Sequence, residues 1–557
     1  MNTNFDFVIV GGGTAGCVLA ARLSADGNYR VCLLEAGGDG RDLLIRLPAG
    51  VVAMMPGKPV KINNWAFDTV PQAGLAGRKG YQPRGKALGG SSAINAMLYV
   101  RGNAADYDEW ASLGCDGWSY AEVLPYFKKS ENNQRGASAL RGDSGPLQVA
   151  EQQSPRPVSQ AFVDACAENG IAPNPDYNGP VQEGAFLYQV TQFHQGERNG
   201  QRCSAAAAYL HPVMDRPNLT VLTRAHAHRI LFDGTRAIGI EYQQDGKVQQ
   251  VRASREVVLS GGAFNSPQLL MLSGVGPQAE LAKHGIAPVQ VLEGVGKNLQ
   301  DHLDCVMSFR SKDTDMFGIG LGALATQISA YRQWRRDGTG MMATPFAEGG
   351  AFFKSSPGVS RPDLQLHFCI SIVDDHARKL HLGYGFSCHV CVVRPASRGT
   401  VFLNSSDPLA PPGIDPQFLS DERDLQLLLA GTRTMRKILN APALASYRAK
   451  ELYTEHVRTE AELEQYVRTH SDTIYHPVGT CKMGVDALAV VDPQLRVHGL
   501  RQLRVVDASV MPRLIGGNTN APTFMIAEKA ADMILAAASP TSATTAQSSA
   551  TVASPVS

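Results

Sequence analysis

Two short segments at opposite ends of the chain carry residue types that suit a common chemical site. The first is the run GGGTAG at residues 11–16, which is followed by an acidic residue, Glu35. The second is the run YHPVGT at residues 475–480, which is followed by NTN at residues 518–520. A glycine-rich turn can hold a dinucleotide, and an imidazole can accept a proton near neutral pH. We therefore expect these segments to form a cofactor half and a catalytic half of one site.

The glycine run lies in the sequence context that a dinucleotide site requires. The pattern of apolar residues predicts a strand at Phe5–Val10, a helix at Cys17–Ser24 and a second strand at Arg30–Glu35. This β-α-β unit distinguishes the motif from an ordinary glycine turn. Glu35 ends the second strand, where a carboxylate accepts hydrogen bonds from ribose hydroxyls and disfavours the 2′-phosphate of NADP. The motif leaves both NAD and FAD open.

Each glycine of the motif has a physical reason. Gly11 permits the tight turn after the strand, Gly13 lets the backbone approach a pyrophosphate, and Gly16 allows the helix to pack closely on the strand. The start of the helix, together with Thr14 and Ala15 before it, offers backbone N–H groups and the positive end of the helix dipole. We expect this segment to bind the phosphates of the cofactor.

His476 and Asn520 are the residues of the second segment that we expect to do chemistry. Pro477 disfavours helical dihedral angles at His476, so the imidazole can project from an extended loop as a proton acceptor. The amide of Asn520 can both donate a hydrogen bond to a hydroxyl group and accept one from it. The alternative is that His476 is a hydrogen-bonded loop histidine and that Asn520 caps a helix predicted at Pro522–Ala537.

Further strands and helices must position these residues. Strands are predicted at Leu219–Leu222, Arg229–Phe232, Ala237–Gln243, Glu256–Leu259, Leu364–Ile372, His389–Val393 and Leu503–Val506. Helices are predicted at Ser266–Leu272, Asp421–Leu439, Thr459–Thr469 and Pro522–Ala537. The alternating strands between Asp304 and Asn404 favour an antiparallel sheet with helices on one side. Both ends of the chain, in contrast, show strand, turn and helix.

These patterns predict an α/β protein with two domains. One is a Rossmann-type dinucleotide-binding domain that is discontinuous in sequence, and the other is an α+β substrate-binding domain with an antiparallel sheet. Residues 539–557 are almost all Ser, Thr, Ala and Pro, which predicts a disordered tail. The predicted dinucleotide-binding segments are 1–155, 206–303 and 486–538, and the predicted substrate-domain segments are 156–205 and 304–485.

Composition and charge narrow the functional classes. The formal net charge is +1, so there is no electrostatic case for nucleic acid or for an anionic membrane surface. No apolar run reaches the length of a transmembrane segment, which leaves only peripheral membrane contact open. No secretory signal precedes the first strand, and the ten cysteines are scattered. We therefore predict reduced thiols and a cytoplasmic protein, with membrane association as a further option.

Several other residues favour structural roles. Cys388 and Cys391 lack a second ligand pair and lie in an alternating strand, so no metal site is predicted. The run GGSSA at residues 89–93 departs from the Gly-x-Ser-x-Gly elbow of serine hydrolases at its last position. His302 is expected to be structural. The histidines without motif support for catalysis are His302, His367, His376 and His389.

Longer motifs give the chain a resemblance to the glucose–methanol–choline (GMC) oxidoreductases. The first is GKALGGSSAIN at residues 85–95, and the second is GAFNSP at 262–267 with SGVG at 273–276. A third is RPASRG at residues 394–399. Within the family, the chain resembles bacterial choline-dehydrogenase-like and aliphatic alcohol dehydrogenases most. The resemblance runs from about residue 5 to about residue 537.

The resemblance implies that the dinucleotide is FAD, held by a glutathione-reductase-like Rossmann domain. Some family members attach FAD covalently through a histidine whose position here is Ile94, so we predict non-covalent FAD. Gly90 and the backbone of Asn95–Leu98 are expected along the flavin, and Trp65 and Ala227 beside the adenine. The full set of expected FAD contacts is Gly11, Gly13, Thr14, Ala15, Gly16, Glu35, Ala36, Trp65, Gly90, Asn95, Ala96, Met97, Leu98, Ala227, Asp507, Ala508, Asn518 and Thr519.

The resemblance also implies a reaction. His476 would be the base and Asn520 its partner in the oxidation of a primary alcohol to an aldehyde, with hydride transfer to flavin N5. The electrons would then pass to a quinone or another acceptor. Choline is less favoured than an uncharged alcohol, because choline-oxidising relatives carry Glu where this chain has the shorter Asp304. The alternatives are an oxygen-using oxidase, a choline dehydrogenase, a hydroxynitrile lyase, a fatty-acid photodecarboxylase and a non-catalytic flavoprotein.

Overall fold

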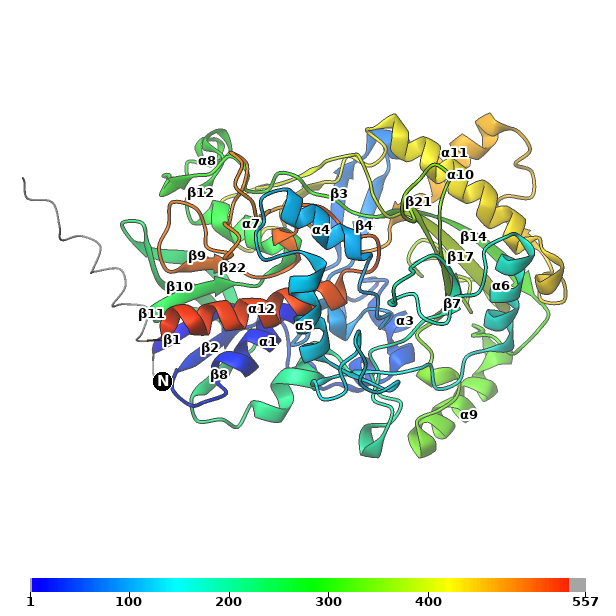
Figure 1. Cartoon of the computed structure of the whole chain (residues 1–557), viewed down its shortest axis with the longest axis horizontal. Helices are drawn as coiled ribbons and strands as arrows, with labels where there is room; N and C mark the ends of the chain where they lie inside the picture. Colours follow the sequence, from blue (N-terminus) through cyan, green and yellow to red (C-terminus); the bar gives the residue numbers. More distant parts are fainter. Residues whose placement is uncertain (1–2, 540–557) are drawn as a thin grey trace, which may run out of the picture.

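The computed structural model describes residues 3–539, and within them two seven-stranded sheets dominate the architecture (Figure 1). One sheet is largely parallel and the other is antiparallel, which confirms the predicted fold class. The predicted tail lies outside the described residues, except for Ser539 at the end of the last helix.

The first sheet gathers strands from three distant parts of the chain. Its strands are β1 (Asn4–Val10), β2 (Val31–Leu34), β8 (Leu219–Leu222), β9 (His226–Asp233), β10 (Arg236–Gln244), β11 (Lys247–Leu259) and β22 (Leu503–Val505). The parallel core runs β8-β2-β1-β11-β22. It is extended by β10, which pairs antiparallel with β11, and by β9, which pairs antiparallel with β10. All four residues of β2 are buried, as expected for a parallel strand that is covered on both faces.

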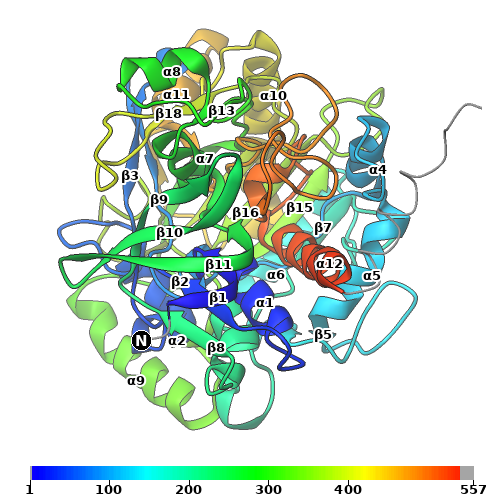
Figure 2. The same ribbon diagram turned by 90° about the vertical axis from the view of Figure 1, so that its left-hand side faces the viewer.

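Two helices from opposite ends of the chain lie side by side on one face of this sheet. They are α1 (Thr14–Leu23) and α12 (Asn520–Ala538) (Figure 2). The first begins earlier than the predicted Cys17, because Gly13 already serves as its N-cap. The second begins before the predicted Pro522, because proline is tolerated in the first turn of a helix. The N-termini of the two helices meet beside the glycine run that follows β1, where Thr14 of α1 is hydrogen-bonded to Asn520 of α12.

The second sheet is antiparallel throughout. Its strands are β7 (Gly184–Leu187), β14 (Leu303–Ser311), β15 (Ala347–Phe353), β16 (Leu364–Cys369), β17 (Tyr384–Val392), β20 (Glu451–Leu452) and β21 (Ser471–Thr473). The order is β20-β14-β17-β16-β15-β7, and β21 also pairs with β14. The helices α6 (Pro157–Glu168) and α10 (Glu422–Leu439) pack on one face, as predicted for this region.

The two faces of β16 have opposite character. Leu364, Leu366 and Phe368 belong to the buried apolar core that includes residues of α6 and α10. Because side chains alternate along a strand, Gln365 and His367 point to the other face. His367 on this polar face lines a cavity between the two sheets and the loops around them.

The remaining elements complete the fold. Asp421 and Thr459 act as N-caps, which places the starts of α10 and α11 one residue beyond the predicted positions.

None of the helices formed by residues 3–539 combines the length and apolar character needed to cross a membrane. The other helices are α2 (Leu43–Arg46), α3 (Val51–Met54), α4 (Ala104–Ser112), α5 (Tyr120–Ser130), α7 (Gly262–Leu272), α8 (Gln278–Lys283), α9 (Leu321–Asp337) and α11 (Glu460–His470). The short strands are β3 (Phe67–Pro71), β4 (Lys79–Gln82), β5 (Glu131–Asn133), β6 (Leu147–Val149), β12 (Val275–Gly276), β13 (Gln290–Val291), β18 (Thr400–Phe402) and β19 (Gly413–Asp415).

Candidate active site

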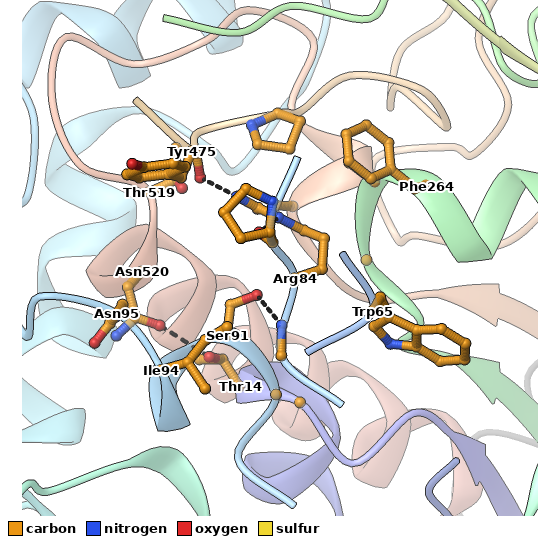
Figure 3. Close-up of a pocket in the computed structure, with 18 of the residues that line it drawn as sticks. Thr14, Trp65, Arg84, Ser91, Ile94, Asn95, Phe264, Tyr475, Thr519 and Asn520 are labelled. Atoms are coloured by element: carbon orange, nitrogen blue, oxygen red, sulfur yellow. Dashed lines mark hydrogen bonds between the residues drawn. The ribbon is translucent and has the colours of Figure 1, made fainter. Parts of the chain in front are cut away.

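A cavity of about 370 Å³ brings the two predicted halves of the site together (Figure 3). Of the residues predicted from sequence, only Gly16 does not line it. A Cβ atom on Gly16 would lie 1.9 Å from the carbonyl oxygen of Gly11, so this glycine serves the packing of α1 against the turn. The predicted residues that line the cavity are Gly11, Gly13, Thr14, Ala15, Glu35, Ala36, Trp65, Gly90, Asn95, Ala96, Met97, Leu98, Ala227, His476, Asp507, Ala508, Asn518, Thr519 and Asn520.

The start of α1 forms an open cradle for an anion. No side chain caps this helix, so its first N–H groups and its positive dipole end face the cavity without a competing carboxylate or hydroxyl. A Cβ on Gly13 would meet nothing closer than 3.9 Å, whereas a Cβ on Gly90 would lie 2.6 Å from the Cα of Gly13. The two glycines let two backbone segments meet at the cradle, which fits the pyrophosphate of a dinucleotide.

Glu35 places a buried carboxylate at the end of β2. Its Oε2 accepts a hydrogen bond from the backbone N of Gly12 at 2.9 Å, and its Oε1 accepts one from the N of Gly37 at 2.7 Å. Burial raises the pKa of Glu35 to about 7, although these two hydrogen bonds and the charge of Lys86 oppose the increase. A carboxylate in this position can accept hydrogen bonds from ribose hydroxyls, as the sequence motif predicts.

The far end of the cofactor half is aromatic. The ring of Trp65 stacks on Phe67 with centroids 5.6 Å apart, and the ammonium of Lys86 lies 4.2 Å from the Trp65 ring centroid. Trp65 and Ala227 line the same end of the cavity as His226. A flat apolar face beside a backbone segment suits an adenine ring.

A buried arginine shapes the loop that lies between the two halves. The Nη1 atom of Arg202 donates hydrogen bonds to the backbone oxygen of Asn95 at 2.5 Å and to its Oδ1 at 3.0 Å. The same Oδ1 accepts a hydrogen bond from the N of Met97 at 2.9 Å, and Met97 adopts a φ of +62°. Ile94 lines the cavity directly before this turn and offers no atom that could bond covalently to a cofactor.

His476 is the centre of a hydrogen-bond chain in the catalytic half. Its Nε2 lies 3.1 Å from Nδ2 of Asn518, and its Nδ1 lies 3.0 Å from Nδ1 of His302. The Nε2 of His302 lies 3.1 Å from the carbonyl oxygen of Val393. The backbone N of His476 donates a hydrogen bond to Asp301 at 2.9 Å, which anchors the loop.

This chain determines which nitrogen of His476 carries the proton. Burial lowers the pKa of His302 to about 3, so its ring is neutral. Since the Val393 carbonyl can only accept, Nε2 of His302 must carry the hydrogen, and Nδ1 of His302 must accept one from His476. The Nε2 atom of His476 is then the unprotonated nitrogen, and it accepts a hydrogen bond from the amide of Asn518.

The surroundings of His476 keep the ring neutral. Burial lowers its pKa well below the ordinary value, and the nearby His302, His367 and Arg84 add to the decrease. The guanidinium of Arg84 donates a hydrogen bond to the backbone oxygen of Tyr475 at 2.8 Å (Figure 3). A neutral imidazole whose Nε2 carries no proton can act as a base at physiological pH.

The amide that is hydrogen-bonded to His476 is that of Asn518. Gln365 holds the amide of Asn518 by donating from Nε2 to its Oδ1 at 3.1 Å. Asn520 is the first residue of α12, and its Oδ1 instead accepts a hydrogen bond from the hydroxyl of Thr14 at 2.8 Å (Figure 3). Asn520 also lines the cavity, so its expected role as the catalytic partner of His476 stays a prediction.

The wall beyond His476 carries buried groups that the sequence motifs missed. His367 is buried in this wall and stacks on the ring of Tyr188, and neither of its ring nitrogens has a partner among the described residues. His389 forms a hydrogen-bonded ion pair with Asp304. Burial lowers the pKa of His389, but the Asp304 carboxylate more than offsets this and raises it to about 10. These positions could have been found only from the alternation of side chains on β16 and β17.

Comparison with known proteins extends the assignment over most of the chain. Sequence profiles of the GMC oxidoreductases match residues 5–304 and 395–527. An alcohol dehydrogenase [acceptor] of Pseudomonas putida is 47% identical over 535 residues, which cover 95% of this chain and 96% of that protein. The mitochondrial choline dehydrogenase of Mus musculus is 45% identical over 542 residues, which cover 95% of this chain and 89% of that protein.

A solved structure agrees with these relatives. The formate oxidase of Aspergillus oryzae RIB40, whose FAD modification has been studied, superposes with a TM-score of 0.87 and 27% identity. The superposition covers 96% of this chain and 99% of the oxidase. The glycine cradle, the carboxylate of Glu35 and the aromatic end of the cavity at Trp65 fit FAD. The chain belongs to the GMC oxidoreductase family and is an FAD-dependent oxidoreductase.

Proposed function

We propose that this enzyme oxidises a primary alcohol to an aldehyde, with His476 as the base that removes the hydroxyl proton. The observation that carries the proposal is the chain from Val393 through His302 to His476, which leaves Nε2 of His476 without a proton. The relatives named above act on alcohols and choline, which supports the same class of substrate for this chain.

The protein side of the reaction follows from the contacts of His476 and Asn518. The Nε2 atom of His476 accepts the proton of the substrate hydroxyl, and the amide of Asn518 holds the oxygen by a hydrogen bond. Gln365 keeps that amide from rotating, because it donates to the Asn518 oxygen. When bound, FAD supplies the hydride acceptor at N5. His476 is only 7% exposed, which limits the access of water to the base.

We propose that FAD is held without a covalent bond. Gly13 and the start of α1 would bind the pyrophosphate, Glu35 the ribose, and Trp65 with Ala227 the adenine. The loop from Asn95 to Leu98 would lie along the flavin, as would Gly90. Asp507, Ala508 and Thr519 complete this set. Ile94 supports dissociable FAD because an aliphatic side chain cannot form the link.

Choline remains a less favoured substrate than an uncharged alcohol. A quaternary ammonium needs an unpaired carboxylate or an aromatic cage. The carboxylate of Asp304 is already paired with His389, whose raised pKa keeps the ring protonated at neutral pH. An incoming cation would therefore meet a neutral pair instead of a negative charge. An uncharged alcohol does not require that pair to break.

The proposal is tested by mixing the purified holoenzyme anaerobically with aliphatic, aromatic, polyol and choline substrates. Loss of the oxidised flavin absorbance with one class identifies the substrate and supports the role of the His476 site. Admission of air then separates an oxygen-using oxidase from a dehydrogenase that needs a quinone or another acceptor. If no alcohol reduces the flavin while dithionite does, alcohol oxidation is wrong, and a lyase or photodecarboxylase reaction takes its place.

A further inference from the structure

Helix α9 presents an apolar face to solvent. Its inward face buries Ala323, Ala330 and Trp334 against the second domain. The residues Leu321, Leu324 and Ile328 follow helical spacing and lie together on the opposite side, with exposures between 46% and 92%. A packed helix normally reverses this arrangement and turns its large aliphatic residues inward.

A neighbouring loop enlarges this apolar surface. Leu380 and Leu382 are 66% and 68% exposed. The loop is tied to the start of α9, because the N atoms of Ile319 and Gly383 each donate a hydrogen bond to the other residue's carbonyl, at 3.0 and 2.8 Å. We call the surface formed by these five side chains the α9 face; its residues are Leu321, Leu324, Ile328, Leu380 and Leu382.

The α9 face borders the mouth of the active-site cavity. Ile319, Lys379 and Leu380 all line that cavity. Since Leu380 lines the cavity and is also well exposed, the cavity reaches the surface beside it. In Figure 1, α9 projects from the lower edge of the molecule on the side away from the first sheet. Any body that covers the α9 face would therefore also cover the route to His476.

Basic residues accompany this apolar surface. Arg332 and Arg335 continue the outward side of α9 beyond Ile328, and within residues 3–539 neither of them forms an ion pair. Lys379 precedes Leu380; its side chain is 62% exposed, and its Nζ lies 4.0 Å from the carboxylate of Asp374. The chain as a whole carries a formal charge of only +1, so this local combination is not a consequence of a generally basic surface.

We infer that the α9 face docks on a lipid bilayer that contains anionic headgroups. Aliphatic side chains would enter the interface while the flanking arginines contact phosphates, which is the arrangement of a monotopic helix. A second copy of this chain fits less well, because a symmetric interface would bring the same arginines together. The inference rests on the proposed function in one respect: docking would open the cavity to alcohols and quinones dissolved in the membrane.

Vesicle flotation of the holoenzyme tests the inference. Wild-type protein should float with vesicles of phosphatidylcholine plus phosphatidylglycerol and much less with phosphatidylcholine alone. The triple substitution Leu321→Ser, Leu324→Ser and Ile328→Ser should lower the bound fraction at least about tenfold, because it removes the inserted aliphatic surface. The substitutions Arg332→Gln and Arg335→Gln should remove most of the preference for phosphatidylglycerol, since each basic residue near an anionic surface contributes roughly a few-fold in affinity.

A matched control uses exposed valines elsewhere. The triple substitution Val181→Ser, Val248→Ser and Val485→Ser removes apolar side chains with exposures of 59% to 71% and should leave flotation unchanged. Equal binding by the α9 variant and the wild type would overturn the inference, as would the absence of wild-type binding. Sedimentation velocity adds a further outcome: a wild-type dimer that the α9 variant abolishes, without vesicle binding, would make the face a self-association surface instead.

Failure of docking and failure of the proposed reaction can be told apart. None of the three substituted α9 residues lines the cavity, so alcohols should still reduce the flavin of the α9 variant in vesicle-free solution. Loss of vesicle binding with intact flavin reduction supports docking as a separate property. The wild-type enzyme could also bind vesicles while no alcohol reduces its flavin. That result would support docking and reject the proposed reaction.

Discussion

The two halves of the active site are built from different material. In the cofactor half, the β-α-β unit contributes glycines and backbone groups to the cavity, such as Gly13 at the uncapped start of α1. In the catalytic half, the groups are side chains from separate segments, with His302, Gln365, His476 and Asn518 joined in one network. The cofactor half therefore depends mainly on the backbone and on the space that glycines leave open. The catalytic half depends on the positions of individual side-chain atoms.

The two halves also differ in how the charge of their main ionisable residue is controlled. Glu35 titrates near neutral pH and sits against backbone N–H groups, so its charge can respond to a bound ligand. His476 is held neutral by burial and by surrounding imidazoles and a guanidinium. Substitutions should therefore affect binding in the cofactor half and the rate of proton transfer in the catalytic half. The predictions that follow test this division.

The largest effect is expected at His476. Substitution by Ala removes the only group placed to accept the hydroxyl proton in the proposed mechanism, and the rate of flavin reduction should fall by about 10² or more. Anaerobic stopped-flow absorbance measures the rate, with His456→Ala as the control because His456 is exposed and has no contact with the cavity. A decrease smaller than about threefold would reject the base role, given the usual size of general-base effects.

The next largest effect is expected at Gly13, and it should appear in binding alone. The protein atom nearest to a Cβ on Gly13 would be 3.9 Å away, so Gly13→Ala should fold normally. The added methyl group would enter the phosphate cradle and should weaken FAD binding at least about tenfold. Fluorescence titration of the apoprotein with FAD gives the affinity. Gly38→Ala is the matched control, because its Cβ also has open space but does not face the cavity. Equal FAD affinity for both variants would contradict the cradle.

The two asparagines should separate in the catalytic half. Asn518→Ala removes a hydrogen bond to the substrate oxygen and to Nε2 of His476, and flavin reduction should slow about tenfold, the size of one buried hydrogen bond. Asn520→Ala breaks only the contact with Thr14 and should slow the reaction less than about threefold by the same reasoning. If Asn520→Ala has the larger effect at saturating FAD, the partner of His476 has been misassigned.

That pair of residues also marks the limit of what the sequence could predict. The glycine run and Glu35 could be placed because the motif is local and its strands and helix follow at once in the chain. His476 could be placed because Pro477 constrains the loop. The choice between Asn518 and Asn520 as the catalytic partner, however, stays a prediction, because the contacts of both amides depend on where α12 begins, and the sequence placed that start two residues late, at Pro522.

The partners of His476 were beyond prediction for another reason. His302 precedes β14, and Gln365 lies on the cavity face of β16, so their contacts arise only when the second sheet closes against the loops. The sequence pattern indicates that side chains alternate between the two faces of β16, but it does not indicate which face borders the cavity. The fold class could therefore be read from local patterns, whereas the hydrogen-bond chain required the tertiary structure.

The smallest effect concerns pH and returns to the cofactor half. Glu35 has a pKa of about 7 when no ribose hydroxyl is bound to it, because burial disfavours its charge. Ribose hydroxyls donate to the ionised form, so FAD should bind more tightly as the pH rises through about 7 and more weakly below it, by at most about tenfold per unit. Titration of the apoprotein with FAD between pH 6 and pH 8 measures this dependence. Glu35→Gln carries no titrating proton and should bind weakly at every pH with a flat profile. A wild-type profile as flat as that of the variant would mean that Glu35 keeps one protonation state throughout, and that the cofactor half is as electrostatically fixed as His476.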